Sequence, residues 1–425
     1  MRNAKSKILL AVALVLGGAL IPTFTAGFRA APHRSPSLPQ SAAQNLPVVR
    51  FGGGGNVAQI PMELAGNQIF APVRINATQP SLFLVDSSQA SSAIDEGRAG
   101  ELGLTAVPSP RASGSENAAA AKEVLDPVLI LPSLGIRMPS LQALPLARMS
   151  AQLGRQIQGL MGEDILQLFV VEIDYDRLNI QLYDPNSFEY AGKGVILPLA
   201  LTNKLPTIRA KVDVPGKRQF EAAFVVDTSF PGAVGFSKAF GDAHKLTSHL
   251  KTRPSSLPAI GSSAESLQGR IKELQLGPLI FAQPVATFLR GQEGAPLNSD
   301  VAGAIGGELL RRLKLILDYP RQRLILETNG HVRELFETDM SGMTLTAEGP
   351  SLKTIRVVNV LEHSAASSAG IQKGDILAGI DGQPAVEYKL SDLREMFRHP
   401  EVEYKLTLDR NGKSIDVKIK LRRLI

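Results

Sequence analysis

Two segments of this chain repeat the same pattern, and the repeat restricts the fold more than any other feature of the sequence. Residues 159–166 are Gly-Leu-Met-Gly-Glu-Asp-Ile-Leu, and residues 303–310 are Gly-Ala-Ile-Gly-Gly-Glu-Leu-Leu. Each copy continues into an apolar run, an Asp-Tyr pair and a second apolar run. The repeat predicts a duplicated fold whose two halves are related by a pseudo-twofold axis.

An apolar run that ends in one aspartate precedes each copy of the repeat. Residues 82–86 are Leu-Phe-Leu-Val-Asp, and residues 224–227 are Phe-Val-Val-Asp. Asp86 lies 73 residues before the first copy (159 − 86), and Asp227 lies 76 residues before the second (303 − 227). A carboxylate at the end of an apolar run is costly to bury without a partner. A single aspartate here is typical of a strand end that caps a turn, but two in matched register predict a facing pair.

The region around these motifs is predicted to be mainly β. From residue 60 to 335, short β-type runs alternate with turn residues, and helical periodicity is scarce. A small polar segment separates each aspartate from its glycine block, at residues 112–117 and 261–265. Each segment is either a flap that closes over a substrate or an ordinary surface loop.

Together these residues resemble the bacterial retropepsin-like aspartic proteases. Each half of that family has an apolar strand, an Asp-Thr/Ser-Gly triplet and an apolar-apolar-Gly block, and the triplets here are residues 86–88 and 227–229. The resemblance implies two pepsin-like, β-barrel-like acid-protease lobes, over residues 60–192 and 193–336. It also points to a subgroup in which a PDZ domain follows the two lobes.

The family's chemistry is acid–base catalysis by the pair Asp86 and Asp227. Two neighbouring carboxyls share one proton, so one takes a proton from a water while its protonated partner hydrogen-bonds the scissile carbonyl. The resemblance implies an extended polypeptide as substrate and no metal or other cofactor. Ser87 and Thr228 would brace the two loops against each other across the axis.

The third position of each triplet departs from the family. Ser88 and Ser229 stand where glycine is usual. Their hydroxyls would either donate to the aspartates or crowd them. Two functions therefore stay open, an aspartic-type endopeptidase and a catalytically inactive scaffold that acts through its peptide-binding PDZ domain.

Residues 340–425 resemble the PDZ domains of bacterial envelope proteases. Residues 352–360 alternate as a half-buried strand does, residues 363–371 suggest a short helix that ends at glycine, and residues 373–382 contain two glycine turns. We expect an α+β domain after the mainly β lobes.

A PDZ domain binds a peptide C-terminus as an added strand, with the carboxylate held by the amides of a loop. We expect the opposite wall to be a helix capped by Ser391 that presents Leu393 and Phe397 at i and i+4. The alternative is a groove filled by the protein's own chain or by the neighbouring lobe. The carboxylate loop is predicted at Gly349, Pro350, Ser351 and Leu352.

The first residues are typical of an export signal. Three basic residues precede a 14-residue apolar run at 8–21, which is short for a bilayer-spanning helix. We expect a signal peptide over residues 1–27 and a flexible linker over 28–59. An uncleaved segment that contacts the membrane is the alternative, and in both cases the protein lies in the periplasm, in the cell envelope or outside the cell.

Composition excludes several other functions. The chain has no Cys, which removes thiol nucleophiles, thiolate metal sites and disulfides. Its six His are scattered without a zinc spacing. Trp is absent, aromatic content is 5%, and the net charge of +6 is spread along the chain, so no nucleic-acid partner is expected.

Overall fold

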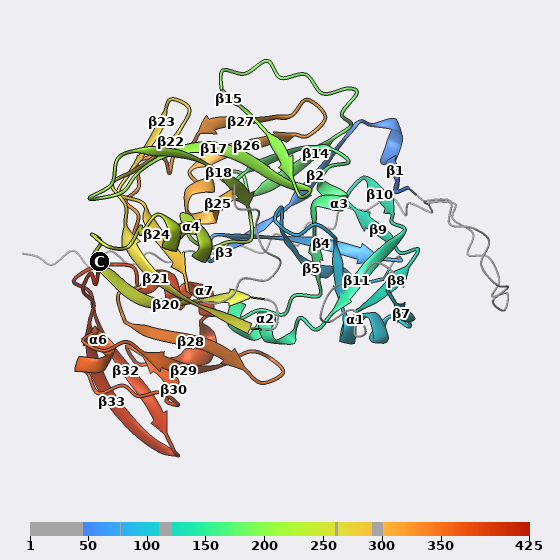
Figure 1. The fold of residues 1–425 in the computed structure, drawn as a ribbon. Coiled ribbons are helices and arrows are strands. Elements are labelled where there is room, and N and C mark those ends of the chain that lie inside the picture. The colour runs from blue at the N-terminus through green and yellow to red at the C-terminus, as the bar shows by residue number, and fades with distance from the viewer. Residues whose placement is uncertain (1–45, 77, 110–120, 260–261, 291–300) are drawn as a thin grey trace, which may run out of the picture. The chain divides into compact units, whose positions relative to one another are not determined.

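The structure is a computed structural model that describes residues 46–425, apart from 77, 110–120, 260–261 and 291–300 (Figure 1). The predicted signal peptide and the first predicted flap, at 112–117, lie outside the described residues. No helix within the described part of the chain is long and apolar enough to cross a membrane.

The first lobe is an 11-stranded sheet arranged around the strand that leads to Asp86. Its order is β1-β10-β9-β4-β5-β12-β6-β11-β8-β7, with β3 paired to β4. The strands are β1 Val48–Phe51, β3 Glu63–Ala65, β4 Gln68–Ile75, β5 Ser81–Val85, β6 Ala93–Asp95, β7 Ala106–Pro108, β8 Lys122–Leu125, β9 Val128–Leu131, β10 Leu134–Arg137, β11 Ser140–Leu144 and β12 Gly159–Met161. The helices are α1 Glu96–Glu101, α2 Ala147–Leu153 and α3 Glu163–Leu166.

The second lobe is a 10-stranded sheet arranged around the strand that ends at Asp227. Its order is β20-β21-β24-β19-β25-β18-β17-β22-β23, with β16 paired to β17. The strands are β16 Ala200–Thr202, β17 Leu205–Asp213, β18 Phe220–Asp227, β19 Val234–Phe236, β20 Thr252–Ala259, β21 Ser262–Arg270, β22 Glu273–Leu276, β23 Leu279–Ala282, β24 Val285–Leu289 and β25 Val301–Gly306. The helices are α4 Lys238–Ala243 and α5 Gly307–Leu310.

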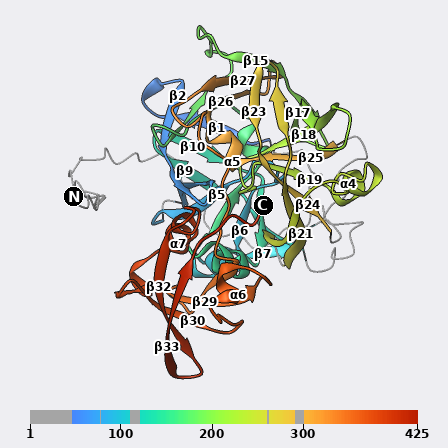
Figure 2. The ribbon, with the colours of Figure 1, turned by 90° about the vertical axis from the view of Figure 1, so that its left-hand side faces the viewer.

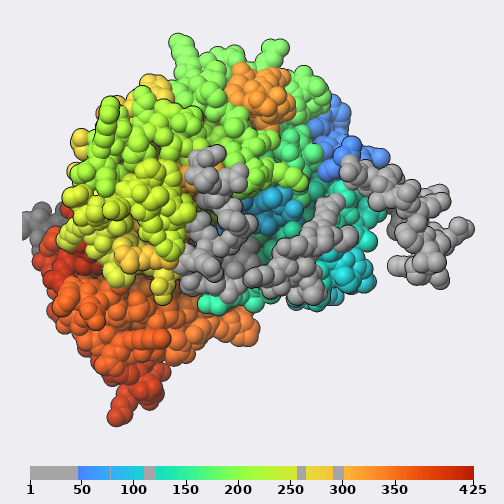
Figure 3. All heavy atoms as spheres, viewed as in Figure 1, coloured from blue at the N-terminus to red at the C-terminus, as the bar shows by residue number. Residues whose placement is uncertain are grey.

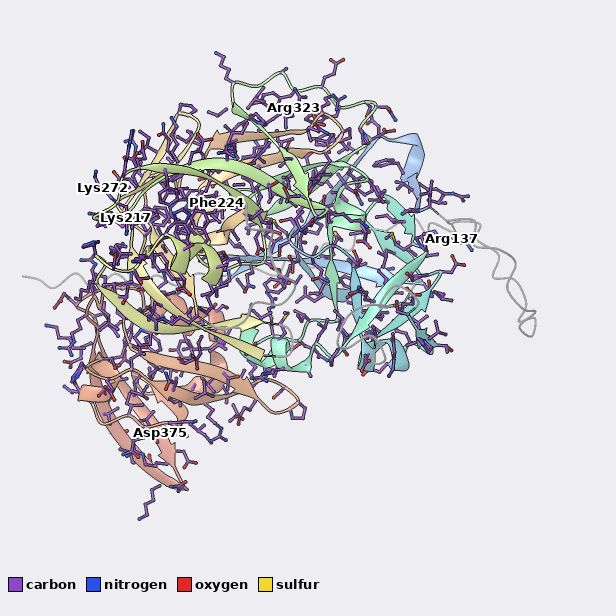
Figure 4. The ribbon with its side chains drawn as sticks, in the orientation of Figure 1. Arg137, Lys217, Phe224, Lys272, Arg323 and Asp375 are labelled. Carbon is purple, nitrogen blue, oxygen red and sulfur yellow. The ribbon has the colours of Figure 1, made fainter. Side chains whose placement is uncertain are left out.

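The two lobes share one topology. In the first, β12 runs parallel to β5 and antiparallel to β6. In the second, β25 runs parallel to β18 and antiparallel to β19. The three residues before each aspartate are apolar and buried, as is typical of strands inside a sheet, and Phe224 of β18 is fully buried within its lobe (Figure 4). The duplication predicted from the repeat is present.

A third sheet of six strands joins the lobes, in the order β15-β27-β26-β13-β14-β2. Its central strands, β13 and β26, pair antiparallel with Glu172 opposite Ile316. These two residues are 144 apart (316 − 172), which is also the offset of the repeat (303 − 159). The pseudo-twofold axis therefore passes through this pair. The strands are β2 Val57–Pro61, β13 Val170–Asp174, β14 Asn179–Tyr183, β15 Val195–Pro198, β26 Leu313–Asp318 and β27 Arg323–Thr328.

The predicted flexible linker over 28–59 is wrong at its C-terminal end. β1 and β2 both begin inside it and pair with strands of the lobes. The glycine run between them forms a short 3-10 turn over Gly52–Gly54, and the Gly52 amide donates to the Ser133 carbonyl at 2.8 Å. The other predicted domain limits stay predictions.

The C-terminal domain has its own sheet and its own apolar core. The sheet order is β28-β29-β30-β32-β33, with β31 paired to β30, and β29, β30, β32 and β33 lie together in both ribbon views (Figures 1 and 2). Asp375 and Arg410 form an ion pair at 2.7 Å in this domain. The elements are β28 Met343–Glu348, β29 Thr354–Val360, α6 Ala365–Ser368, β30 Ile376–Ile380, β31 Gln383–Pro384, α7 Leu390–Met396, β32 Glu403–Arg410 and β33 Lys413–Lys420.

The fold class is thus mainly β, with two duplicated lobes followed by an α+β domain, as the sequence predicted.

Candidate active site

The two predicted aspartates leave equivalent strands of the two lobes. Asp86 follows β5, and its amide donates to the Met161 carbonyl of β12 at 2.9 Å. Asp227 is the last residue of β18 and lies opposite Gly306 at the end of β25. Asp86 is 7% exposed, and Asp227 is half-buried. Both carboxyls therefore sit at the end of a buried parallel strand pair.

Four reciprocal hydrogen bonds join the two loops. The Ser87 amide donates to Thr228 Oγ1 at 3.1 Å, and the Thr228 amide donates to Ser87 Oγ at 3.1 Å. Each hydroxyl then donates to a carbonyl of the opposite lobe, Ser87 Oγ to Val226 and Thr228 Oγ1 to Val85, both at 2.7 Å. Ser87 and Thr228 are fully buried. This brace fixes the position of each aspartate relative to the other.

Ser88 and Ser229 supply donors to the aspartates. Ser88 donates to Asp86 Oδ1 through its hydroxyl at 2.7 Å and its amide at 3.0 Å. Asp227 Oδ1 accepts the hydroxyl and the amide of Ser229, each at 2.9 Å, and the amide of Phe230 at 2.9 Å. Neither serine is among the described residues with a left-handed backbone. Serine is thus accommodated in place of glycine, and its hydroxyl adds a hydrogen bond.

The two carboxyls influence each other's ionisation. Burial, followed by the charge of Asp227, raises the pKa of Asp86 from 3.8 to about 7. Burial also raises the pKa of Asp227, while its hydrogen bonds from Ser229 and Phe230 oppose the rise. A pair of this kind holds one proton over a wide pH range. The arrangement can take a proton from a water and donate one to a substrate.

Two neighbouring side chains hold the loop after Asp227, and the sequence did not single them out. Gln68 Nε2 donates to the Ser229 carbonyl at 2.6 Å, and Asn67 Nδ2 donates to the Pro231 carbonyl at 3.0 Å. Asn67 lies in the β3–β4 turn of the first lobe, and Gln68 is the first residue of β4. A Gly-Asn turn is common in hairpins, so its local sequence carries no sign of this contact.

The second predicted flap coincides with a long hairpin. β20 and β21 pair from Thr252 opposite Gly269 to Ala259 opposite Ser262. The base of the hairpin contacts the C-terminal domain, because Arg253 donates to the Asp339 carbonyl at 2.8 Å. Figure 3 shows the orange C-terminal residues adjoining the yellow-green residues of this lobe.

The predicted carboxylate loop of the C-terminal domain is in the wrong place. Gly349, Pro350, Ser351 and Leu352 form the turn between β28 and β29, and β29 pairs with β28 on one side and β30 on the other. A peptide cannot add a strand beside β29, because both of its edges are used. The open edge belongs to β28, so the loop before it, at residues 339–342, takes the position of the carboxylate loop.

The predicted helix wall also needs correction. The N-cap of α7 is Lys389 rather than Ser391, whose hydroxyl donates to Asp392 at 3.0 Å. Leu393 and Phe397 are fully buried in the core of the domain. Their i, i+4 spacing therefore reports packing under the helix and not a surface that faces a ligand.

The first lobe contacts both β28 and α7, the two elements between which a PDZ domain would bind a peptide. Thr346 Oγ1 of β28 donates to the Ala151 carbonyl at 3.2 Å. Arg394 of α7 donates to the Gln152 carbonyl at 2.8 Å and to the Leu345 carbonyl at 3.0 Å. Both lobe carbonyls belong to α2, which lies beside β28 (Figure 1). These contacts favour the alternative in which the neighbouring lobe occupies the peptide-binding position.

Two amides of the loop before β28, and the amide of the first residue of β28, already have acceptors. Met340 donates to the Phe397 carbonyl at 2.7 Å, Ser341 to Asp339 Oδ1 at 2.8 Å, and Met343 to Ser341 Oγ at 3.0 Å. Burial raises the pKa of the Asp339 carboxyl. An incoming peptide carboxylate would have to displace these acceptors.

No group of three or more His, Cys, Asp or Glu within the described ranges could hold a metal ion.

Comparison with known proteins identifies the C-terminal domain. Residues 334–409 match the sequence model of the PDZ domain. This part of the chain is a PDZ domain. The prediction of a PDZ domain is thereby confirmed, while its predicted limits of 340–425 stay a prediction, and the match leaves the two lobes unassigned. No curated protein matches the sequence.

Several solved structures resemble parts of the chain. The HtrA3 PDZ domain bound to a phage-derived ligand is 27% identical, covering 19% of this chain and 80% of that chain with a TM-score of 0.17. The photosystem II D1 C-terminal processing protease is 17% identical. The match covers 27% of this chain and 29% of that chain, with a TM-score of 0.19. This chain thus spans less than a third of that protease. An aspartic proteinase from Irpex lacteus is 14% identical, covering 65% and 99%, with a TM-score of 0.37.

Proposed function

We propose that the protein is an aspartic-type endopeptidase of the retropepsin-like kind, in which Asp86 and Asp227 activate water to hydrolyse polypeptides. The observation that carries the proposal is the reciprocal brace between Ser87 and Thr228. It joins the two loops that begin at Asp86 and Asp227, and burial raises the pKa of both carboxyls. A turn that merely caps a strand has no need of a matching partner loop.

The hydrogen bonds suggest a role for each carboxyl. Asp227 Oδ1 accepts three donors and Asp86 Oδ1 accepts two, so ionisation is favoured at Asp227. Asp227 is then the base that takes a proton from the attacking water. Protonated Asp86 donates to the scissile carbonyl and stabilises the developing oxyanion. Transfer of a proton to the amine leaving group completes hydrolysis.

The rival is a catalytically inactive scaffold that binds peptides. Casein cleavage measured from pH 3 to 8, with and without pepstatin, separates the two. The endopeptidase predicts pepstatin-sensitive cleavage that falls as the pH rises through about 7, where the pair loses its last proton. Absence of cleavage at every pH, with peptide binding retained, would favour the scaffold.

Peptide binding by the PDZ domain is a second part of the proposal. The open edge of β28 supplies the unpaired backbone groups that an added strand needs. Because α2 contacts this edge, a peptide must compete with α2 for it.

Export is the third part. The basic residues followed by the apolar run at 8–21 support secretion into the periplasm, the envelope or the medium. Fractionation of the expressing cell, with N-terminal sequencing of the mature protein, tests it. Retention of the whole chain in the cytoplasm would contradict it.

A further inference from the structure

A buried glutamate connects the PDZ domain to the loop that carries Asp227. Glu308 is the second residue of α5, directly after the glycine block of the second repeat, and it is 5% exposed. Its carboxylate accepts hydrogen bonds from both lobes and from the PDZ domain. The donors are Asn67, Arg311, Arg312 and Arg398.

Arg398 is the PDZ-domain residue that donates a hydrogen bond to Glu308. It follows Phe397, the C-cap of α7, and its Nη2 donates to Glu308 Oε2 at 2.8 Å. The Arg398 side chain is only 13% exposed. The charge of Arg398, with those of Arg311 and Arg312, lowers the pKa of Glu308 against the effect of burial. Glu308 is therefore a carboxylate, which binds an arginine donor more strongly than a neutral acid does.

Asn67 is the contribution of the first lobe. Its Nδ2 group donates both to Glu308 Oε2 at 2.6 Å and to the Pro231 carbonyl at 3.0 Å. Asn67 also packs closely on α5, because a Cβ atom at Gly307 would lie 1.7 Å from the Asn67 carbonyl oxygen. Glu308 thus holds Asn67 in the β3–β4 turn, and Asn67 holds the loop after Asp227.

The backbone of α5 holds the same loop from the other side. The Gly307 amide donates to the Phe230 carbonyl at 2.7 Å, and the Glu308 amide donates to the Gly232 carbonyl at 3.2 Å. The four carbonyls of residues 229–232 therefore all accept hydrogen bonds. The donors are the first amides of α5 and the side chains of Asn67 and Gln68. Glu308 belongs to this group of contacts and also accepts the hydrogen bond from Arg398.

We propose that Arg398 of the PDZ domain is a positioning residue for Asp227, acting through Glu308 and Asn67. The inference rests on the proposed function. Arg398 and Asn67 share Glu308 Oε2, so loss of Arg398 lets this carboxylate turn toward the remaining arginines on Oε1. Asn67 then loses one of its two acceptors, and the loop that presents Asp227 is less firmly held.

The test compares full-length variants in steady-state cleavage of a peptide substrate. Arg398→Met removes the donor at similar length, and Arg398→Lys retains a charge. Asn67→Gly removes the amide, and glycine suits the left-handed backbone at this position, where φ is 66°. Arg422→Met is the matched control, because Arg422 donates to the His363 carbonyl inside the PDZ domain.

We expect Arg398→Met and Asn67→Gly each to lower kcat roughly tenfold with KM nearly unchanged, because displacement of a catalytic group affects the chemical step. Arg398→Lys should recover part of the loss, and the double variant should lose little more than the worse single variant. Arg422→Met should retain the wild-type kcat.

Two results would overturn the inference while leaving the proposed function intact. One is a wild-type kcat in Asn67→Gly, which remains informative even if Arg398→Met does not fold. The other is an equal loss in Arg422→Met, which would indicate a general effect of the PDZ fold. Absence of cleavage by the wild type would instead reject the proposed function itself.

Discussion

At the scale of single residues, the two serines that replace glycine have a chemical consequence. The Ser88 hydroxyl donates to Asp86 Oδ1, and a donor of this kind stabilises the ionised carboxyl. It therefore opposes burial and the charge of Asp227, which together raise the pKa of Asp86 to about 7 even with this hydrogen bond in place. The serine sets the upper limit of the pH range in which the pair holds one proton.

Ser88→Gly tests this effect. Loss of the hydroxyl should raise the pKa of Asp86 further, so the alkaline limb of the kcat/KM profile should move to higher pH. Ser248→Gly, on an exposed turn, is the control. A limb that stays in place, or moves to lower pH, would contradict the proposed interaction.

The buried carboxyl of Glu163 contributes to the pH dependence of stability. Burial raises the pKa of Glu163 from 4.5 to about 8, and the Tyr319 hydroxyl donates to its Oε2 at 3.0 Å. In the folded state Glu163 therefore keeps its proton at pH values above 4.5, where the unfolded state releases it. The stabilisation is complete below that pH and is lost as the pH rises through about 8.

Glu163→Gln should remove this pH dependence. Between pH 5 and 8 the free energy of unfolding of the wild type should fall by up to about 1.4 kcal/mol per pH unit from this group, whereas the variant should lack that part of the slope. Urea unfolding at several pH values measures it, with the exposed Glu189→Gln as control. Parallel slopes in wild type and Glu163→Gln would show that Glu163 is ionised in the fold.

How far the sequence predicts a residue depends on how local its environment is. The matched spacing of Asp86 and Asp227 was enough to pair them. Glu308 stood in the repeat, yet nothing there indicated its role, because its partners come from residues 67 and 398. Contacts over such separations leave no local pattern.

At the scale of elements, the contact of α2 with β28 of the PDZ domain was the least expected from the sequence. The alternation of β28 was present in the sequence, and its residues are alternately buried and half-buried in the fold. The predicted carboxylate loop lies one strand too late in the chain, because β29 alternates too and alternation does not show which strand is at the edge. The packing of α2 on β28 depends on tertiary structure and could not be predicted from periodicity.

Gly154→Val should release α2 from the PDZ domain. Gly154 is left-handed with φ of 69°, and a Cβ atom there would lie 2.3 Å from Leu390 Cβ on α7. A left-handed backbone costs a non-glycine residue about 1–2 kcal/mol, so amide exchange in α2 should accelerate roughly tenfold. An extended peptide should also bind the variant more tightly than the wild type.

Gly241→Ala, inside α4 with open space around it, is the control for that experiment. Tight peptide binding by the wild type, with α2 amides still protected, would show that peptide and α2 do not compete.

At the scale of the whole molecule, the repeat determines the architecture. An offset of 144 residues relates the glycine blocks and also the strands β13 and β26 that meet on the axis. The sequence therefore predicted two lobes and the meeting of their aspartates. It did not predict the six-stranded sheet that joins them, because strand order across lobes depends on pairing between distant segments.

The central claim is that one carboxyl from each lobe performs hydrolysis as a pair. The most direct measurement is the cleavage rate of the full chain with Asp86→Asn and Asp227→Asn as single variants, and with the exposed Asp242→Asn as control. Each of the first two variants is expected to lose activity by roughly a thousandfold or more while remaining folded, and Asp242→Asn is expected to match the wild type. A wild-type rate in either Asp86→Asn or Asp227→Asn would contradict it.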